Sequence, residues 1–224
     1  MIGSVRTGTS GWPDVAIVSG VLASDVAVVV PIRRDPPMGF LVEALASVYR
    51  LECGTVFYMD GSGGTAAAMN QGVRDAVDAG YDWFFWHAAD DTCGWDLLEK
   101  LAAAHDGEAE IVFPNIEVVG DDGEHRFFWG SEFDPGKLYE VAQIPGIAVV
   151  HKDVWGRAGG FPDLPYGPDW GLYATAYAAK PFQAIYVPDA VYRWRQHRQS
   201  ESGDAEANLE LYAPLNALLN ELDP

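Results

Sequence analysis

The amino-acid sequence predicts an α/β protein whose sheet is mainly parallel in its first half. Three strand-like runs support this prediction, each followed by a loop and then a helical pattern: Val26–Ile32, Thr55–Met59 and Asp82–His87. Successive strand–loop–helix units imply right-handed crossovers between parallel strands. In such sheets, ligands bind beyond the carboxyl ends of the strands. We therefore expect functional residues in the loops that follow these three runs.

The first two units also carry helix signals. The first run is continuous and β-branched, typical of a strand buried on both faces, and apolar residues then recur on one helical face between residues 40 and 48. The second run ends in a glycine-rich turn that contains Asp60. A helix is predicted after it over about Thr65–Ala79, with Gly80 as its C-terminal cap.

The third unit places two adjacent carboxylates at the end of an aromatic strand. Asp90 and Asp91 follow this run closely, and a helix with a leucine-rich face begins near Trp95. Adjacent carboxylates repel each other, and Mg²⁺ or Mn²⁺ would relieve the repulsion while binding substrate phosphates. The alternative is an N-cap aspartate beside a solvated neighbour. The pair alone does not decide between the two.

The second half of the chain has a mixed pattern. Strands are expected over Ile111–Pro114, Gly146–His151 and Ala184–Pro188, with a hairpin around Asp121-Asp122-Gly123. A helix is expected to about Ala179, and a polar tail over Gln196–Asp204. A final helix would place Leu211, Leu215, Leu218 and Leu222 on one stripe. Pro214 stands in the first turn of that last helix, where it would introduce a kink. We find no internal repeat or linker, so we expect one domain.

One apolar stretch, from Val15 to Ile32, is long enough to suggest a targeting signal or a membrane span. Asp25 lies inside it, and a carboxylate at mid-membrane costs about 2.5–3.5 kcal/mol on insertion scales. We therefore interpret the stretch as two buried strands, Asp14–Val21 and Asp25–Ile32, joined by a turn near Ser24. No transmembrane segment is expected.

Charge and cysteine content narrow the function classes. Fourteen Lys and Arg against 33 Asp and Glu give a net charge of −19. Such a surface repels polyphosphate, so sequence-independent nucleic-acid binding is not expected, whereas a metal-bound nucleotide is compatible with it. Two cysteines, Cys53 and Cys93, do not make a disulfide framework. We expect both to be reduced, in a cytoplasmic protein.

Two later segments combine turn residues with polar side chains. Gly159–Asp163 and Pro168–Leu172 form a loop that leads into a helix, which Asp169 would cap. Tyr192–His197 is a basic aromatic cluster after a strand, followed by Ser200 and Ser202. Taken alone, the first segment is typical of a turn, and the second is typical of a row of side chains on the surface of a strand.

In their order along the chain, these segments resemble the inverting family-two glycosyltransferases of the GT-A fold. The strand Val28–Pro31 is similar to the family's first strand and its proline, and FFWHAADD resembles its DxD-type metal motif. Gly64-x3-Ala68-x-Asn70-x-Gly72 resembles the family segment G-x3-A-R-N-x-G. GGFPD…PDW resembles the family's GGFDE…EDW, and RWRQHRQSES resembles its R-x-H-x2-S-x-S. The resemblance covers about residues 26–202. Met69, Ala88 and Pro168 depart from the family pattern, and one strand–helix pair before Asn70 is missing.

The resemblance implies a single GT-A-like domain over residues 1–224. It has a mainly parallel nucleotide-sugar-binding half to about residue 105, a smaller mixed acceptor-side half to about residue 203, and a C-terminal helix over 204–224. The implied reaction moves a sugar from a nucleoside-diphosphate sugar to an acceptor hydroxyl with inversion, with Mn²⁺ or Mg²⁺ as cofactor. The acceptor stays open among a saccharide, a lipid, a protein and a modified nucleotide.

The resemblance also assigns roles to individual residues. Asp169 is the expected general base, which deprotonates the acceptor hydroxyl as the C–O bond forms. Asp91 is the expected metal ligand, Asp90 shares the metal or contacts the ribose, and His197 is a second ligand through neutral imidazole. The expected donor contacts are Pro31, Asp60, Asn70, Asp90 and Arg195, of which Asp60 meets the nucleoside and Arg195 the diphosphate.

We compared three other functions with the sequence. A non-catalytic GT-A-like binding protein is favoured by the departures at Ala88 and Pro168. A sugar-phosphate nucleotidylyltransferase needs a glycine-rich loop after the first strand, but that loop has no glycine between Ile32 and Gly39. A dinucleotide oxidoreductase needs G-x-G-x-x-G after a strand, and the sequence lacks it.

Overall fold

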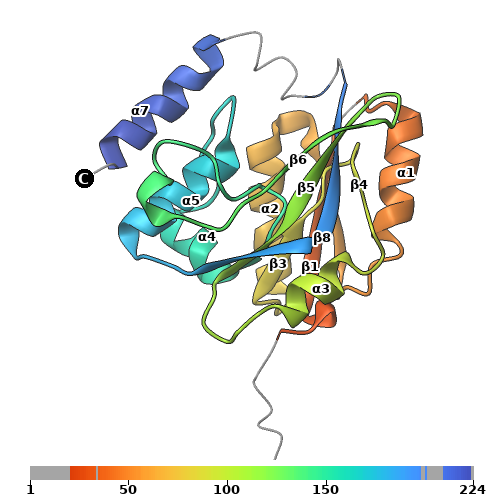
Figure 1. Cartoon of the computed structure of the whole chain (residues 1–224), viewed down its shortest axis with the longest axis horizontal. Coiled ribbons are helices and arrows are strands. Elements are labelled where there is room, and N and C mark those ends of the chain that lie inside the picture. Colours follow the sequence, from red (N-terminus) through yellow and green to blue (C-terminus); the bar gives the residue numbers. More distant parts are fainter. Residues whose placement is uncertain (1–20, 34, 198–199, 201–208, 223–224) are drawn as a thin grey trace, which may run out of the picture.

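A curled mixed sheet of eight strands organises the computed structural model, which describes residues 21–33, 35–197, 200 and 209–222 (Figure 1). The strands are β1 (Val26–Ile32), β2 (Val56–Asp60), β3 (Trp83–Trp86), β4 (Thr92–Cys93), β5 (Ile111–Gly120), β6 (His125–Trp129), β7 (Val149–His151) and β8 (Ala184–Gln196). The α-helices are α1 (Met38–Val48), α2 (Thr65–Asp78), α3 (Leu97–Ala103), α4 (Lys152–Ala158), α5 (Pro168–Ala179) and α7 (Ala213–Leu222).

The sheet order is β2-β1-β3-β7-β5-β8-β4, and β6 pairs with β5 as a hairpin. β1 pairs in parallel with β2 and β3, which confirms the predicted parallel first half. β7 lies antiparallel between β3 and β5, and β5 pairs in parallel with β8. It follows that β1, β2, β3, β5 and β8 run in the same direction and end at one edge of the sheet.

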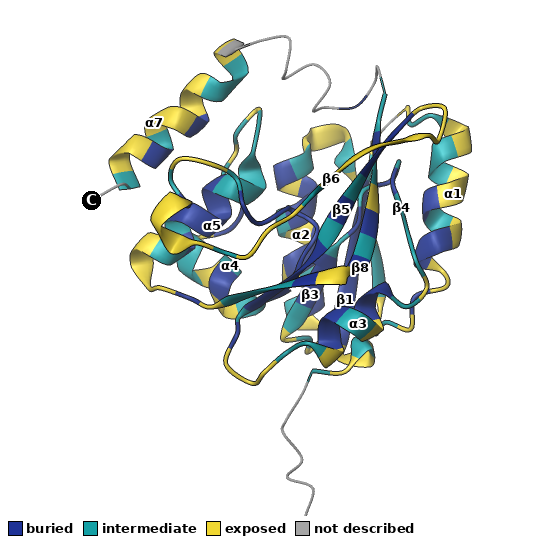
Figure 2. Ribbon diagram, in the orientation of Figure 1, coloured by how far each residue is buried: buried dark blue, intermediate teal, exposed yellow. Residues whose placement is uncertain are grey.

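Helices cover both faces of the sheet. One core cluster joins the β1 valines to Val48 of α1 and to Leu97, Leu98 and Leu101 of α3. A second cluster, on the other face, joins Met69 and Val73 of α2 to α4 and α5. Figure 2 shows buried residues along the inner strands and the facing sides of these helices, and α7 packs against α5.

Helix α2 packs tightly against the sheet at Gly72. A Cβ atom at this position would lie 2.3 Å from Cγ1 of Val29 in β1 and 3.0 Å from Cγ of Met59 in β2. Val29 and Met59 therefore leave room only for a glycine on this turn of the helix. At the end of α2, Gly80 has the positive φ of +94° that its predicted role requires.

The sequence located most elements of the first half correctly, but it ended two strands too early, began a third too early and missed two short elements. The strand predicted over Ile111–Pro114 continues to Gly120, and the strand predicted over Gly146–His151 begins at Val149. The predicted strand Asp14–Val21 lies almost wholly outside the described residues. The strand predicted to end at Pro188 continues to Gln196, because three residues bulge between the pairs Pro114–Val187 and Asn115–Val191 and pairing then resumes. β4 and α4, with two and seven residues, are too short for a periodic pattern.

The cysteines agree with expectation. Both Cys53 and Cys93 are free, as predicted. Burial raises the pKa of the Cys93 thiol to about 12. Among the described residues, no helix combines the length and apolar character that a bilayer span requires.

His87 is completely buried, directly after β3. Its Nδ1 lies 2.7 Å from the carbonyl oxygen of Ala88, and its Nε2 lies 3.4 Å from Oγ of Ser47 in α1. The Tyr192 ring packs edge-on at 5.1 Å. Burial lowers the pKa of His87 to about 4, although the contact with the Ala88 carbonyl opposes the shift. The folded protein therefore keeps this ring neutral.

We expect His87 to make the protein less stable as pH falls from 6.5 to about 4. In that window the unfolded chain binds a proton that the folded chain does not, which lowers the free energy of unfolding by about 3 kcal/mol. Urea unfolding at pH 7 and pH 4.5 measures the effect, with His87→Asn as the comparison because the amide can still donate to the Ala88 carbonyl. An equal pH dependence in both proteins would contradict the prediction.

Candidate active site

Residues far apart in the sequence meet where the parallel strands end. The loop Ala88–Asp91 follows β3, and His197 directly follows β8. Asp90 and His197, 107 residues apart, lie 3.0 Å from each other between Oδ2 and Nε2. The predicted edge of the sheet is therefore where these polar side chains gather.

The Asp90–His197 pair is nearly enclosed. The His197 side chain is 5% exposed and that of Asp90 is 26% exposed. The His197 ring lies 5.1 Å from the ring of Phe40 in α1, and Ser200 donates a hydrogen bond from Oγ to the His197 carbonyl oxygen. Ser202 lies outside the described residues. A carboxylate and an imidazole nitrogen at this separation form a donor set that Mn²⁺ accepts.

Asp91, the expected metal ligand, turns inward. It is 2% exposed, Oδ1 accepts a hydrogen bond from the backbone N–H of Arg195 at 2.7 Å, and Oδ2 accepts one from the Tyr192 hydroxyl at 3.1 Å. Burial, together with the neighbouring Asp90, raises the pKa of Asp91. Asp90, not Asp91, is the carboxylate that meets His197. Adjacency in sequence does not tell which of two carboxylates will be buried.

Arg195 lies beside this pair with its side chain 10% exposed. One guanidinium nitrogen, Nη2, donates to Oε2 of Glu43 at 2.5 Å, and the guanidinium carbon lies 4.2 Å above the Phe40 ring. Nε and Nη1 are buried and have no hydrogen-bond partner among the described residues. The guanidinium is therefore held by α1 on one side and keeps two donors unused.

Asp169 is the second residue of α5, whose N-cap is Gly167. The carboxylate thus does not cap the helix in the predicted way. Burial raises the pKa of Asp169, against the effect of backbone N–H groups that include that of Gly146. A Cβ atom at Gly146 would lie 2.8 Å from Oδ2 of Asp169 and 2.4 Å from Cζ3 of Trp86. Gly146 therefore allows Asp169 and the end of β3 to approach each other.

Asn70 holds the loop after α4. Its Oδ1 accepts hydrogen bonds from the backbone N–H of Phe161 and from Nε1 of Trp155, at 2.8 and 2.9 Å, and its Nδ2 donates to the Phe161 carbonyl at 2.8 Å. Gly160, with φ of +100°, passes close to the same amide. Asn70, for which the resemblance implies a donor contact, thus fixes the GGFPD segment.

The two remaining predicted contacts lie on the first two strands. Pro31 is buried in β1, two residues beyond the last β1–β3 pair, so its missing N–H breaks no pairing with β3. Asp60 is exposed at the end of β2, opposite Ile32, and its Oδ1 accepts a hydrogen bond from the Ser62 N–H at 2.9 Å. Both stand at the edge where the strands end.

Sequence reasoning gave several residues near the site no role of their own. Phe40, Glu43 and Gly146 belong to ordinary helix or strand patterns, whereas Trp86 and Tyr192 lie within segments that the sequence analysis singled out. Only the fold brings the five residues to this edge. Nε1 of Trp86 is buried without a hydrogen-bond partner within the described part of the chain. None of these contacts follows from spacing, because each joins separate elements.

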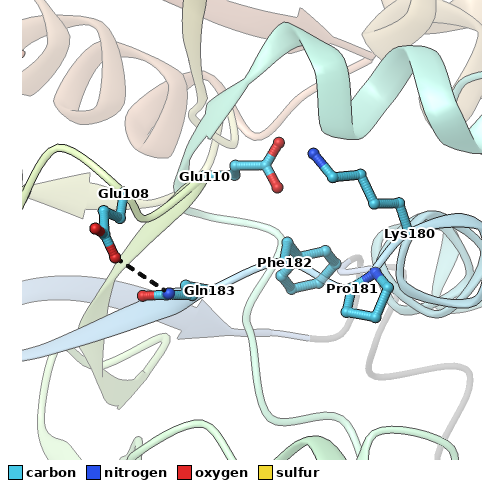
Figure 3. A pocket seen from close by; sticks show the side chains of 6 residues that line it. All are labelled: Glu108, Glu110, Lys180, Pro181, Phe182 and Gln183. Atoms are coloured by element: carbon cyan, nitrogen blue, oxygen red, sulfur yellow. Dashed lines mark hydrogen bonds between the residues drawn. The ribbon is translucent and has the colours of Figure 1, made fainter.

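A pocket at the opposite edge of the sheet is a separate feature (Figure 3). It is lined by Glu108, Glu110, Lys180, Pro181, Phe182 and Gln183, at the amino ends of β5 and β8. Glu110, His151 and Asp153 also offer ligand atoms within 4.8 Å of one another there. However, Arg157 binds both carboxylate oxygens of Glu110, at 2.7 and 3.0 Å, so this cluster is a poor metal site.

The fold is similar to that of solved structures that contain nucleotide sugars. S. aureus TarS 1-349 in complex with UDP-GlcNAc superposes with a TM-score of 0.62 at 14% identity, over 87% of this chain and 66% of that one. The mannosyltransferase PcManGT from Pyrobaculum calidifontis, in complex with GDP-Man and Mn²⁺, gives 0.53 at 16% identity, over 88% and 69%. A second S. aureus TarS structure gives 0.56 at 14% identity, over 88% and 42%.

These likenesses confirm the predicted GT-A-like α/β fold. The chain spans about two thirds of the length of TarS 1-349 and less than half of the second TarS chain. In sequence, no curated protein matches it. The sequence profile of the family described as "Glycosyl transferase family 2" matches residues 41–157, which is more than half of the chain and includes Asn70, Asp90 and Asp91. The chain belongs to glycosyl transferase family 2.

Proposed function

We propose that this protein is a metal-dependent glycosyltransferase that moves a sugar from a nucleoside-diphosphate sugar to an acceptor hydroxyl with inversion. The observation that carries the proposal is the Asp90–His197 pair at the ends of the strands, with Arg195 beside it. Family membership supports the class of reaction, and similar folds that contain UDP-GlcNAc or GDP-Man support the class of donor.

Asp90 and His197 would hold Mn²⁺ or Mg²⁺. When bound, the ion neutralises charge that grows on the departing diphosphate. The Nε and Nη1 groups of Arg195 would donate to diphosphate oxygens. Glu43 and the Phe40 ring orient this guanidinium before the donor arrives, so less order has to be created on binding.

Asp169 would act as the general base on the acceptor hydroxyl. Burial raises its pKa, which makes the carboxylate a stronger base than that of an exposed aspartate. A single base on the acceptor side suits a single displacement, which inverts the anomeric carbon. The loop that Asn70 fixes leads into α5 and thus supports the position of this base.

We further propose that residues up to about 105 bind the nucleotide sugar and that residues from about 106 to 203 receive the acceptor. Asp90 belongs to the first part, and Asp169 to the second. Two free thiols, Cys53 and Cys93, suit a reducing compartment, and we propose a cytoplasmic location.

Asp90→Ala should weaken Mn²⁺-dependent binding of UDP or GDP by at least about tenfold, because it removes one of two protein ligands. His197→Ala should have a similar effect. Calorimetry with and without Mn²⁺ measures both, and Asp96→Ala is the control because Asp96 pairs with Lys100 on the surface. Nucleotide binding by the wild-type protein that Mn²⁺ does not change would instead favour a non-catalytic relative.

Asp169→Asn should lower turnover by about 10²–10⁴-fold and leave donor binding intact. The amide cannot accept the acceptor proton, whereas α5 keeps Gly167 as its N-cap. Transfer or slow hydrolysis of the nucleotide sugar measures turnover. The matched control is Asp163→Asn, an exposed aspartate in the preceding loop. Turnover close to that of the wild type would remove Asp169 from the mechanism.

A further inference from the structure

We propose that Asp91 and Tyr192 form a clamp between the loop Ala88–Asp91 and β8, and that this clamp sets the separation of Asp90 and His197. In this view Asp91 and Tyr192 are positioning residues and not metal ligands. The inference rests on the proposed function, since it assigns a task to residues around the metal pair.

Three hydrogen bonds make up the clamp, two of them buried and one part-buried. The Ala88 N–H donates to the Tyr192 hydroxyl at 3.1 Å, and that hydroxyl donates to Oδ2 of Asp91 at 3.1 Å. The Arg195 N–H donates to Oδ1 of Asp91 at 2.7 Å. Tyr192 is 0% exposed and Asp91 is 2% exposed, so water does not compete for these bonds. Both carboxylate oxygens are used to join the loop to the strand.

The clamp residues lie close in sequence to Asp90 and to His197, the proposed metal ligands. On the loop, its bonds involve Ala88 and Asp91, which lie on either side of Asp90. On β8, they involve Tyr192 and Arg195, and His197 follows two residues later. β4 extends the same junction, because Thr92 and Cys93 pair directly with Arg193 and Tyr192. A shift of the loop along β8 would therefore change the distance from Asp90 to His197.

A bound ion makes that distance critical. Mg²⁺ requires ligands at about 2.0–2.1 Å, so a displacement of even 1 Å costs a ligand. A buried carboxylate is an expensive way to fix a loop, because the charged group loses its hydration. The free-energy cost of burying this carboxylate is explained if the carboxylate must hold two donors of β8, the Tyr192 hydroxyl and the Arg195 N–H, in one geometry. Groups that orient metal ligands typically change metal affinity 10–100-fold when removed.

Tyr192→Phe tests the clamp. The variant keeps the ring that packs against Phe85 and His87 but deprives Ala88 of an acceptor and Asp91 of a donor. We expect a 10–100-fold loss of Mn²⁺ affinity in the presence of UDP or GDP, measured by electron paramagnetic resonance well below the melting temperature. The spin-echo signal of the His197 imidazole nitrogen on Mn²⁺ should weaken as well.

Two further variants complete the test. Tyr186→Phe removes a hydroxyl from the same strand, next to Phe113, and should bind Mn²⁺ as the wild type does. Asp91→Asn keeps the size of the side chain but places an amide N–H against a donor, and it should lose affinity as Tyr192→Phe does.

The outcomes separate this inference from the proposed function. Wild-type protein that binds no Mn²⁺ with either nucleotide would overturn both. If the wild type binds and Tyr192→Phe shows only a lower melting temperature, with unchanged Mn²⁺ affinity and nitrogen signal, the clamp is merely structural and the inference fails alone. Loss of affinity in Asp91→Asn but not in Tyr192→Phe would make Asp91 a direct ligand and would also overturn it.

Discussion

The candidate site depends on the parallel pairing of β5 with β8. β8 leaves this pairing for three residues after Val187 and resumes it at Val191, so that the strand reaches the same edge as β3. Tyr192, Arg195 and then His197 lie on the part beyond the bulge. If β8 ended at Pro188, the loop after β3 would face no imidazole and no guanidinium. The chemistry of the first half of the chain therefore requires a strand from the second.

Charge explains why the donor and the metal belong together here. The protein has a net charge of −19, and the site itself contains Asp90, Asp91 and Glu43 against one arginine. A bare diphosphate approaches such a surface against repulsion. In the proposed function, a cation held between Asp90 and His197 would reverse the sign of the local field, which a single guanidinium paired with Glu43 would not do. The acidic composition of the protein is thus a physical reason for the proposed metal dependence, because the cation would offset the repulsion of the diphosphate.

Sequence patterns predicted those features that are local. The β-branched run of β1, the helical face of α1 and the order of the motifs gave the parallel half, the GT-A-like fold and the edge with Asp90, Asp169 and His197. The contact of Asp90 with His197, the burial of Asp91 and the contacts of Asn70 depend on which way each side chain turns. Those directions are set by β8 and by the loop near residue 161, about 90 to 105 residues away. No spacing rule reaches that far.

The tight packing at Gly72 affects how mutational scans of this protein should be interpreted. Any larger residue there meets Val29 and Met59 and displaces α2, which carries Asn70 two residues earlier. Asn70 in turn holds the loop that leads to α5 and Asp169. A substitution in the middle of a core helix would therefore register as lost activity before the protein unfolds. If the proposed function holds, screens that score activity alone would assign Gly72 to the catalytic centre, although it is buried against Val29 and Met59.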